Sequence, residues 1–541
     1  MLFARAERRT LRIAGGLAIG AVLVFVGAAT AMLLAYAGGG SSAPLLDAYI
    51  RRVAEFTLMQ AVLSTLLSVT LAIPVARALA RQRGFPGRIW IVRLSMVPLG
   101  LPALVAALGV IEIWGRQGVV NDLLRLAGLQ NPVSVYGLTG ILIAHVFFNL
   151  PLAARFLLAA LDRIPAEYWL TSANLGMGSG AVFRLIEWPV IRRVLPGIAG
   201  LVFMLCVTSF TIVLTLGGGP AATTIEVAIY QALRFDFDPE RAVLLAFLQI
   251  VVTAALLWLI SLFGRPPEEG MTAGRAIRRF DARGRRLPDA LVILLFTLFT
   301  AAPLVATLVS GLSADLARLA LDPLLHRAFL TSLAISLASA SLSLAIALPV
   351  VLVPRLAETG DAGLATRLMG RTLPMVGSLI LLVPPVVVAT GWFLMLRTFG
   401  ETGRFAPAVI TVINALMALP FVIRVLEPAY RTHISRTARL ALSLGATGFH
   451  RLRWIDWPAL RKPFLTAFAF AMALSLGDLG AIAIFGAEGF ITLPWLLFSR
   501  MASYRTADAA GIALILGVLC LLLTLPSTAA DRQTESPRSD A

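Results

Sequence analysis

The sequence predicts an all-α integral membrane protein with about 12 transmembrane helices in two parallel six-helix repeats. Three observations lead to this fold class: an apolar composition, regularly spaced apolar runs and a long internal repeat. Of the 541 residues, 58% are hydrophobic and only 14% are charged, and the mean hydropathy is +0.87. A soluble domain cannot bury that much apolar surface, so the composition predicts a bilayer as the solvent.

The apolar runs give the expected helices in order. A spanning helix needs about 20 mainly apolar residues. Runs of this kind lie near residues 13–37, 57–80, 95–115, 136–160, 195–217, 243–264, 288–313, 328–354, 371–398, 405–426, 464–486 and 507–526. The first run is longer than the about 7–15-residue core of a cleaved signal, so we expect a retained helix. Prolines in the third and ninth runs predict a kink or a break.

The net charge of +17 reflects arginines at the ends of these runs. Arginine clusters fall on alternate loops, around residues 5–9, 81–88, 184–193 and 275–286, with a smaller number on the opposite loops. Cytoplasmic loops of membrane proteins carry an excess of Lys and Arg. The pattern predicts that these loops and both termini are cytoplasmic, and it gives no reason to expect a nucleic acid partner.

Two arginine-bearing stretches interrupt the apolar sequence and resemble each other. We call residues 175–193 (LGMGSGAVFRLIEWPVIRR) the first polar segment and residues 444–462 (LGATGFHRLRWIDWPALRK) the second polar segment. Gly176 and Gly445 differ by 445 − 176 = 269 positions, and the same offset pairs Glu187 with Asp456. One offset without gaps over a long stretch indicates a tandem duplication.

The duplication defines the expected domains. Residues 1–264 form the first membrane repeat, residues 265–287 a cytoplasmic linker, and residues 288–541 the second membrane repeat. Six spans return the chain to its starting side, so both polar segments must face the same side and the repeats must be parallel.

Each polar segment is expected to form a short helical projection that docks in a partner's groove, although a plain solvated loop is the alternative. Apolar residues alternate with arginine at helical spacing, a glycine allows a sharp turn, and Trp-Pro marks the start of the next helix. The candidate docking residues are Leu175, Gly176, Phe183, Arg184, Ile186, Trp188 and Pro189 in the first copy, and Leu444, Gly445, Leu452, Arg453, Ile455, Trp457 and Pro458 in the second.

We expect the arginines and the acids of the two polar segments to have different roles. Arg184 and Arg453 are candidates for salt bridges to the partner. Glu187 and Asp456 are expected to be structural, as acids at a helix start that the helix dipole favours.

The chain lacks the sequence features of an ATPase or a metal site. Lys462 is its only lysine and is followed by proline, so no phosphate-binding Gly-Lys-Ser/Thr loop is present. ATP hydrolysis would require a separate subunit, and we expect neither enzyme activity nor a cofactor here. Two cysteines in apolar runs and four scattered histidines give no metal-binding pattern.

Asp478 is an ionisable residue inside an apolar run, and its position there requires an explanation. An ionisable group at that depth costs about 2.5–3.5 kcal/mol on insertion scales. Its equivalent in the first repeat is Ser209, because 478 − 269 = 209. Two interpretations stay open: Asp478 lines a translocation pathway with Ser209, or it binds backbone amides freed by Gly477 and Gly480.

A glycine-rich stretch follows the fifth run on the outer side. Gly217, Gly218, Gly219 and Pro220 are candidates for an outer gate or for a contact with a cargo-delivering protein. The alternative is an ordinary helix end followed by a loop. Glu226 is expected to line that opening or to lie in solvent.

The spacing Gly-x9-Ile-x-Trp-Pro in both polar segments resembles the coupling loop of ABC-importer permeases, through which the permease contacts its ATPase. The sequence departs from the family motif at two places. The motif begins with Glu-Ala-Ala, where this chain has Leu-Thr-Ser (170–172) and Arg-Leu-Ala (439–441), and this chain has Trp where the motif has Leu before Pro. The resemblance implies a type I ABC-importer permease fold, an ATP-binding partner in two copies and an extracytoplasmic binding protein.

Longer stretches resemble one group of fused double binding-protein-dependent permeases, those of bacterial importers for thiamine and thiamine phosphates. They are YGLTGILIAHVFFNLP (136–151), LGGGPAATTIEVAIYQAL (216–233), FDPERA (237–242), GRQG (115–118) and SLGDLGAIAIFG (475–486). This resemblance implies a multi-pass protein of the bacterial inner membrane. Permeases for iron(III), ion-gradient secondary transporters and channels are the alternatives.

Overall fold

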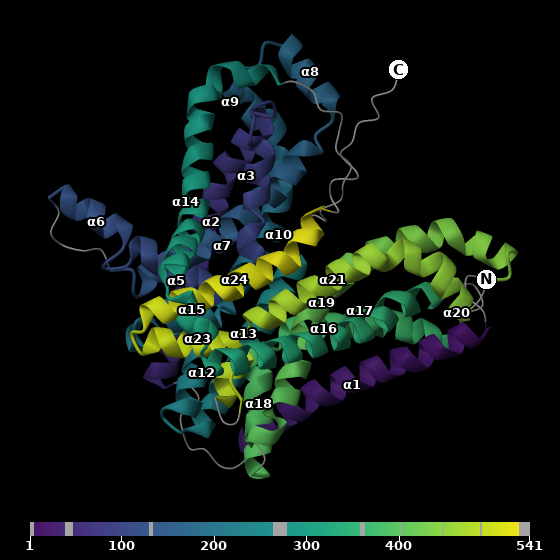
Figure 1. Cartoon of the computed structure of the whole chain (residues 1–541). Coiled ribbons are helices and arrows are strands. Elements are labelled where there is room, and N and C mark those ends of the chain that lie inside the picture. Colours follow the sequence, from purple (N-terminus) through teal and green to yellow (C-terminus); the bar gives the residue numbers. More distant parts are fainter. Residues whose placement is uncertain are drawn as a thin grey trace. The chain divides into compact units, whose positions relative to one another are not determined.

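The computed structural model describes residues 5–37, 47–128, 134–262, 279–357, 363–400, 402–446, 448–486 and 490–529. Every regular element in these ranges is a helix (Figure 1). Most of the predicted linker, from residue 265 to 278, lies outside the described ranges.

The helices of the N-terminal part are α1 (Arg5–Ala37), α2 (Ala48–Arg81), α3 (Arg88–Leu94), α4 (Val97–Gly100), α5 (Ala103–Trp114), α6 (Val119–Leu126), α7 (Leu138–Asp162), α8 (Ala166–Asn174), α9 (Ser179–Val182), the π-helix η1 (Phe183–Glu187), α10 (Trp188–Val207), α11 (Phe210–Leu216), the 3₁₀ helix η2 (Pro220–Ala222), α12 (Ile225–Arg234) and α13 (Pro239–Leu262).

The helices of the C-terminal part are the 3₁₀ helix η3 (Phe280–Arg285), α14 (Arg286–Ser313), α15 (Leu316–Ala320), α16 (Pro323–Ala357), α17 (Leu364–Leu382), α18 (Pro385–Thr398), α19 (Thr402–Ser443), α20 (Gly448–Arg451), the π-helix η4 (Leu452–Asp456), α21 (Trp457–Gly477), α22 (Gly480–Phe485), α23 (Leu493–Ala502) and α24 (Thr506–Ala529).

The chain forms two compact units, which we name after their central helices. The α2 unit contains residues 44–228 and 251–314, and the α16 unit contains residues 1–43, 229–250 and 315–541. Helix α1 therefore lies in the unit built from the second half of the chain, and α14 lies in the unit built from the first half. These units differ from the predicted repeats 1–264 and 288–541, whose boundaries stay a prediction.

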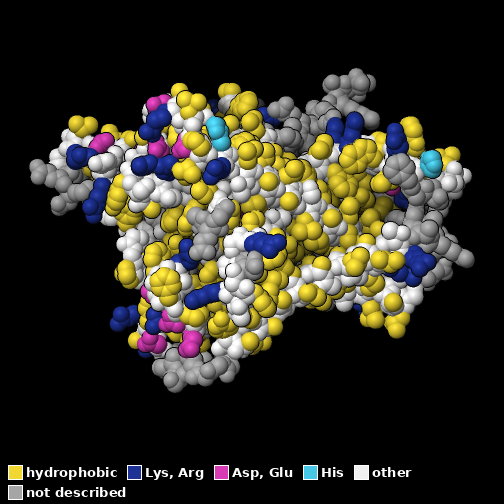
Figure 2. Space-filling view, turned by 60° about the horizontal axis from the view of Figure 1, so that its bottom comes forward, with side chains coloured by type: hydrophobic (Ala, Val, Ile, Leu, Met, Phe, Trp, Pro, Cys, Tyr) yellow, Lys and Arg dark blue, Asp and Glu magenta, His cyan; other side chains and the backbone are white. Residues whose placement is uncertain are grey.

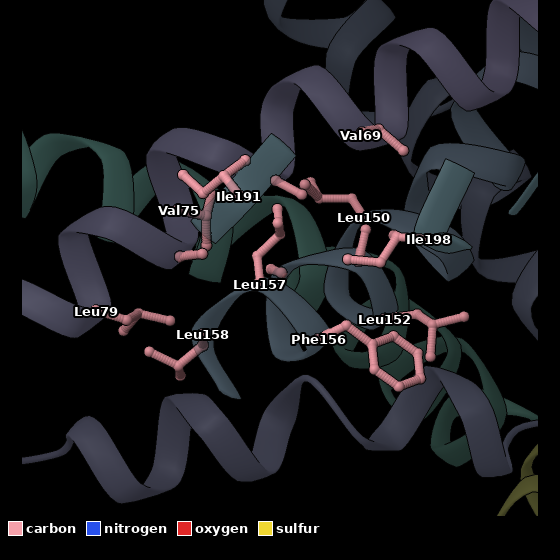
Figure 3. Packing of buried hydrophobic residues seen from close by; sticks show 14 of the residues in the cluster. Val69, Val75, Leu79, Leu150, Leu152, Phe156, Leu157, Leu158, Ile191 and Ile198 are labelled. Carbon is pink, nitrogen blue, oxygen red and sulfur yellow. The ribbon is translucent and has the colours of Figure 1, made fainter. Parts of the chain in front are cut away.

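The core of the α2 unit is made by α2, α7 and α10. Large side chains such as Leu157, Ile191 and Ile198 are fully buried where the three helices meet (Figure 3). Alanines between them, including Ala76 and Ala153, have no exposed surface. Small residues let helix backbones approach closely, which is how helices associate where lipid is as apolar as the side chains.

The α16 unit has a matching set in α16, α19 and α21, with α1 lying along α16 and α18. The indole of Trp392 in α18 stacks on Phe25 of α1 with 4.7 Å between the ring centroids. Its Nε1 donates a hydrogen bond to the Phe25 carbonyl oxygen at 3.1 Å. The N-terminal helix is thus held by specific contacts, and its retention stays a prediction.

The structure has 11 helices long and apolar enough to span a membrane within the described residues, and one shorter apolar helix, Pro385–Thr398. Figure 2 shows hydrophobic side chains over much of the surface, as expected where lipid replaces water. The ninth predicted run divides into α17 and α18 at Pro384, and the third breaks at Pro102. Both breaks were expected from proline.

Two breaks were not expected. The fifth run divides between α10 and α11 at Thr208–Ser209, and the eleventh divides between α21 and α22 at Asp478–Leu479. Neither site contains proline. The predicted loop after the tenth run is also wrong, because α19 continues as a helix to Ser443.

Short helices of the same type occur at positions 269 residues apart in the two polar segments. The π-helices begin at Phe183 and Leu452, and 452 − 183 = 269. The short helices α9 and α20, at Ser179 and Gly448, are related by the same number. The parallel relation of the two complete repeats stays a prediction.

Two glycines mark where α14 and α1 approach their neighbours. In the α2 unit, a Cβ on Gly109 of α5 would overlap the Pro303 carbonyl oxygen of α14 and lie 2.6 Å from Thr307 Oγ1. In the α16 unit, a Cβ on Gly391 of α18 would overlap the backbone of Ala29 in α1. Backbone atoms cannot move aside as side chains can, so glycine is required at both positions.

We expect Gly109→Val and Gly391→Val each to lower the free energy of unfolding by about 1–3 kcal/mol, the usual cost of overpacking. Chemical denaturation in detergent micelles measures the change. Gly20→Val in α1 is the control, because nothing lies within 4 Å of a Cβ there. Equal stability losses in all three variants would contradict the proposed close approaches.

Candidate functional site

Each polar segment turns at its glycine as predicted. Gly176 and Gly445 both have φ of +62°. After them the chain closes a helix end, with Met177 N donating to the Ser172 carbonyl at 2.9 Å and Ala446 N donating to the Ala441 carbonyl at 2.9 Å. This is the hydrogen bond of a helix terminus that ends in a left-handed residue, usually glycine.

The α-helices α10 and α21 begin at Trp188 and Trp457, as the Trp-Pro pairs predict, but a helical stretch that was not predicted to be continuous with them precedes each. This stretch begins at Ser179 and at Gly448, and it continues through a π-helical turn into α10 or α21. Proline inside an α-helix lacks an N–H and its ring clashes with the carbonyl four residues earlier. The wider π turn directly before Pro189 and Pro458 relieves that clash, so one continuous helix leads from each polar segment into the apolar core.

Glu187 is the buried centre of the first polar segment. Its carboxylate accepts hydrogen bonds from Arg77 Nε of α2 at 2.6 Å and from an Arg279 guanidinium N–H at 2.7 Å. Its side chain has no exposed surface. The prediction of a structural acid agrees with this geometry, but the cause differs, because Glu187 lies within a continuous helix and pairs with two arginines instead of a helix dipole.

The two arginines also stack on aromatic rings of the same region. The Arg77 guanidinium lies 4.0 Å from the Phe183 ring centroid, and that of Arg279 lies 4.0 Å from the Trp169 ring centroid. Burial lowers the pKa of Arg279, but Asp281 and Glu187 outweigh burial and leave that pKa raised. Arg279 therefore stays charged and joins the chain before α14 to the first polar segment.

A second ion pair lies next to the first. Arg81 of α2 donates to both carboxylate oxygens of Asp289 in α14, at 3.1 and 2.5 Å, and to Ser179 Oγ at 2.9 Å. Gln82 Nε2 also donates to Asp289 at 2.9 Å. Two-pronged arginine–carboxylate pairs fix orientation as well as distance. The first polar segment is therefore rigidly held on α2 and α14.

The second polar segment is held by a different set of side-chain contacts. Asp456, the equivalent of Glu187, lies 2.7 Å from His433 Nε2 of α19 and 3.4 Å from Arg451 Nε. The Thr437 hydroxyl donates to the His433 carbonyl at 2.8 Å. Here a histidine supplies part of the contact that two buried arginines supply in the first copy.

The structure divides the candidate docking residues into buried and exposed groups. Phe183 and Ile186 are partly buried against the α2-unit core, and Ile455 and Pro189 are also partly buried. Exposed are Leu175, Gly176, Arg184, Trp188, Leu444, Gly445, Leu452, Arg453, Trp457 and Pro458. Arg184 and Arg453 have exposed side chains, as a contact with a partner requires.

Two exposed apolar residues were missed by the sequence analysis. Leu185 is 65% exposed and Trp454 is 71% exposed. They are equivalent, since 454 − 185 = 269. The available signal was the repeat itself, because an apolar residue facing outward at the same position of both copies indicates a contact surface.

Asp478 lies in the break between α21 and α22, and its Oδ1 accepts a hydrogen bond from Gly480 N at 3.2 Å. Its Oδ2 is buried without a hydrogen-bond partner. This geometry favours the structural interpretation, in which the carboxylate binds an amide that the break leaves free. Ser209 occupies the equivalent break and makes no side-chain cap hydrogen bond to α11.

Buried polar residues lie beside these breaks in both units. In the α2 unit, Gln60 Nε2 donates to the Cys206 carbonyl at 2.9 Å, and Ser64 Oγ lies 2.9 Å from His145 Nδ1. In the α16 unit, Asn414 Nδ2 donates to Ser475 Oγ at 3.0 Å. Asn414 and Ser475 are the 269-residue equivalents of His145 and Cys206, so the same two positions make polar contacts in both copies, with different partners.

The glycine-rich stretch after α11 is tightly packed. Gly137 N donates to the Leu216 carbonyl at 2.7 Å, and a Cβ on Gly217 would lie 2.5 Å from the Val213 carbonyl oxygen. A Cβ on Gly218 would lie 2.9 Å from the Tyr136 side chain, and Gly218, Gly219 and Pro220 are all exposed. This geometry favours an ordinary helix end.

Glu226 was expected at an opening or in solvent. That expectation is wrong, because Glu226 is buried.

The chain is similar to known transport proteins. A family model described as "Binding-protein-dependent transport system inner membrane component" matches residues 68–327. The chain is 52% identical to the thiamine transport system permease protein of Brucella abortus over 530 residues, 96% of this chain and 95% of the relative. It is 44% identical to the protein of that name from Escherichia coli K12 over 478 residues, 88% of each.

A more distant similarity covers only part of the chain. The molybdenum transport system permease protein of Mycobacterium bovis is 30% identical over 197 residues, which are 36% of this chain and 72% of that protein.

We expect Glu187→Gln to lower the free energy of unfolding by about 3–5 kcal/mol, because it leaves two largely buried arginines without their common anion. Denaturant titration in micelles measures the loss. Glu55→Gln is the control, since the Arg51–Glu55 pair is 69% and 68% exposed and such pairs contribute about 0–1 kcal/mol. Equal changes in the two variants would show that the buried network does not hold the segment.

Proposed function

This chain belongs to the family of binding-protein-dependent transport system inner membrane components, and on that premise we propose that it is the permease of an ATP-driven importer for thiamine and thiamine phosphates. It is a multi-pass inner membrane protein and a transport subunit, not an enzyme. The observation that carries the proposal is the pair of equivalent polar segments, each presenting exposed apolar and arginine side chains from a rigid helix.

The partners follow from the family and from the geometry. Binding-protein-dependent transport implies an ATPase and a substrate-binding protein. Two copies of the ATPase are proposed, because two equivalent projections fit a two-fold symmetric partner. ATP is used by that partner, and this chain needs no cofactor. Both polar segments and both termini are placed on the cytoplasmic side by their arginine content.

A mechanical path supports the coupling role. The helix that starts at Ser179 continues through η1 and α10 to Val207, next to the break at Ser209. In the second copy the helix from Gly448 leads through η4 and α21 to Gly477, next to Asp478. A helix seated in a groove of the ATPase moves with it, so closure of the ATPase displaces the intramembrane break at the other end of the same helix.

The anchoring ion pairs make this transmission efficient. Glu187, Arg77 and Arg279 join the first projection to α2 and to the chain entering α14, so a force on the projection moves these helices together. Asp456 and His433 join the second projection to α19. Closure of the ATPase dimer would bring both projections together, open the permease outward, and allow cargo from the binding protein to enter.

The cargo assignment is supported by full-length similarity to thiamine permeases. The Gly480 N hydrogen bond to Asp478 Oδ1 supports a structural role for this carboxylate, so the cargo assignment does not rest on Asp478. An ion-gradient transporter would leave the paired projections without a role. Uptake of radiolabelled thiamine into a deletion strain complemented with this chain tests the proposal, and uptake that persists with a hydrolysis-dead ATPase would overturn it.

We expect the double variant Leu185→Ala, Trp454→Ala to weaken association with the ATPase about 10-fold or more, since exposed apolar residues at the centre of an interface carry most of its binding energy. Pull-down titration of the detergent-solubilised permease measures the affinity, and thermal stability should not change. Leu126→Ala is the control, because Leu126 is 85% exposed in α6, outside both polar segments. Unchanged ATPase affinity would remove these residues from the interface.

For Asp478, we expect Asp478→Asn to change the KM of thiamine uptake less than about 2-fold, because the amide oxygen can still accept the Gly480 hydrogen bond. Asp478→Ala loses this acceptor and should cost about 1 kcal/mol of stability. Uptake assays and denaturation of the same preparations measure both effects. Loss of uptake in Asp478→Asn at full stability would assign the carboxylate to cargo binding.

A further inference from the structure

Two short stretches at one end of the α2 unit carry arginine beside exposed apolar side chains. In α3, Ile89 is 56% exposed and Trp90 is 69% exposed. At the start of α14, Arg285 and Arg286 are exposed, and Leu287 after them is 85% exposed. None of these residues belongs to a polar segment or to the ion pairs that anchor the first one, so they need a separate explanation.

Hydrogen bonds hold both stretches at the same level, the end of α2. Arg88 Nε of α3 donates to the Leu79 carbonyl in the last turn of α2 at 3.1 Å. Arg81 in the same turn binds Asp289 in the first turn of α14, and α3 packs on α14 (Figure 1). Helices α2 and α14 are both long enough to span a membrane. The two stretches therefore lie side by side where these spans meet water.

The outward face of α14 is apolar over the half that follows these arginines. Leu287, Leu291, Leu294 and Leu298 recur at helical spacing and are between 56% and 85% exposed. From the first to the last of them there are 298 − 287 = 11 steps, which extend about 16 Å along a helix. The hydrocarbon core of a bilayer is about 30 Å thick. The leucine stripe therefore matches the length of one lipid leaflet.

The outward side of α3 continues this surface. Ile91 and Val92 pack against the core of the α2 unit, as does Val292 of α14. Trp90 is exposed instead, and its ring centroid lies 5.1 Å from the Arg93 guanidinium. Tryptophan is enriched where a membrane meets water, because its amphipathic ring sits at the level of the lipid headgroups. Trp90 thus indicates the headgroup level beside the start of α14.

The positive charge of this surface is not neutralised by the described part of the chain. Arg93, Arg285 and Arg286 make no salt bridge to any described carboxylate. Four carboxylates at this end of the unit are already bound by other arginines, in the pairs Arg81–Asp289, Arg83–Asp162, Arg279–Glu187 and Arg279–Asp281. Clustered arginines next to a spanning helix attract anionic headgroups.

One occupant has to satisfy both the arginines and the leucine stripe. A free anion pairs with the arginines and leaves the leucines without a partner. A soluble protein such as the ATPase can reach Arg285 and Arg286, but Leu294 and Leu298 lie within the span, where it does not enter. A phospholipid with an anionic headgroup matches both parts, because its charge lies at the membrane surface and its acyl chain is one leaflet long.

We propose that α3 and the start of α14 form a binding site for an anionic phospholipid. Arg285 and Arg286 bind the phosphate, Trp90 packs at the level of the headgroup, and an acyl chain lies along the leucines of α14. Arginine suits this role because its planar guanidinium donates two parallel hydrogen bonds to phosphate oxygens. The bound lipid braces α3 against α14, whose Asp289 holds Arg81. The site requires only that the chain spans a membrane, and it does not depend on the proposed cargo.

The test measures lipid binding to the purified permease–ATPase complex in detergent micelles, with phosphatidylglycerol as the probe and native mass spectrometry as the readout. We expect Arg285→Gln with Arg286→Gln to weaken phosphatidylglycerol binding about 10-fold or more, because two groups that attract the phosphate are lost. Arg51→Gln with Arg52→Gln is the matched control, since both arginines are exposed at the other end of α2, and it should bind this lipid as the wild type does. Wild-type affinity in the first variant, or the same loss in both variants, contradicts the proposal.

Three comparisons separate an anionic lipid from the other occupants. Phosphatidylcholine with the same acyl chains should bind more weakly, and equal affinity would show that charge does not select the lipid. Phosphatidylglycerol should raise the Tm of the complex, whereas equal stabilisation by inorganic phosphate would assign the arginines to a free anion. The lipid-free variant Arg285→Gln with Arg286→Gln should keep the wild-type Tm and ATPase affinity, and a loss of that affinity would assign these arginines to the ATPase. Each contrary result overturns the proposal, and none of them bears on thiamine uptake.

Discussion

The burial of Glu187 between two arginines is the interaction on which the architecture of the first polar segment depends. An ionised carboxylate with no exposed surface is costly unless charges of opposite sign surround it. Arg77 comes from α2 and Arg279 from the chain that enters α14, so satisfying one acid fixes three distant parts of the chain. Because these contacts hold the projection at a set angle, the helix behind it can carry motion instead of absorbing it.

The two repeats hold their polar segments with different side chains. The first projection has buried arginines, aromatic rings and the Arg81–Asp289 pair behind it. The second has Asp456 between His433 and Arg451. The same asymmetry recurs inside the membrane, where Asn414 and Ser475 replace His145 and Cys206. Duplication preserved positions, while each copy changed its side chains, so two docking sites of one shape differ in how firmly they are held.

Sequence patterns predicted the fold class, the spans and the offset, because apolar periodicity and duplication are written in the order of residues. They located the glycine turns at Gly176 and Gly445 for the same reason. They failed where the outcome depends on residues far apart in the chain: the partners of Glu187, the burial of Glu226 and the grouping of α1 with α18. The break at Ser209 carries no local signal, whereas the break at Asp478 lies between Gly477 and Gly480, which the sequence already indicated as a place where backbone amides are freed. The π turns that precede Trp188 and Trp457 were not predicted.

The placement of α1 has a consequence for how the chain is made. Helix α1 is synthesised before its partner α18, which begins at Pro385, 385 − 37 = 348 positions after the end of α1. At a synthesis rate of about 5–20 residues per second, α1 waits roughly 20–70 s for the helix that receives it. Helix α16, which also lies along α1, begins earlier, at Pro323, but the face around Ala29 that contacts α18 faces lipid until α18 is made. Completion of the α16 unit is therefore a late step that follows synthesis of most of the chain.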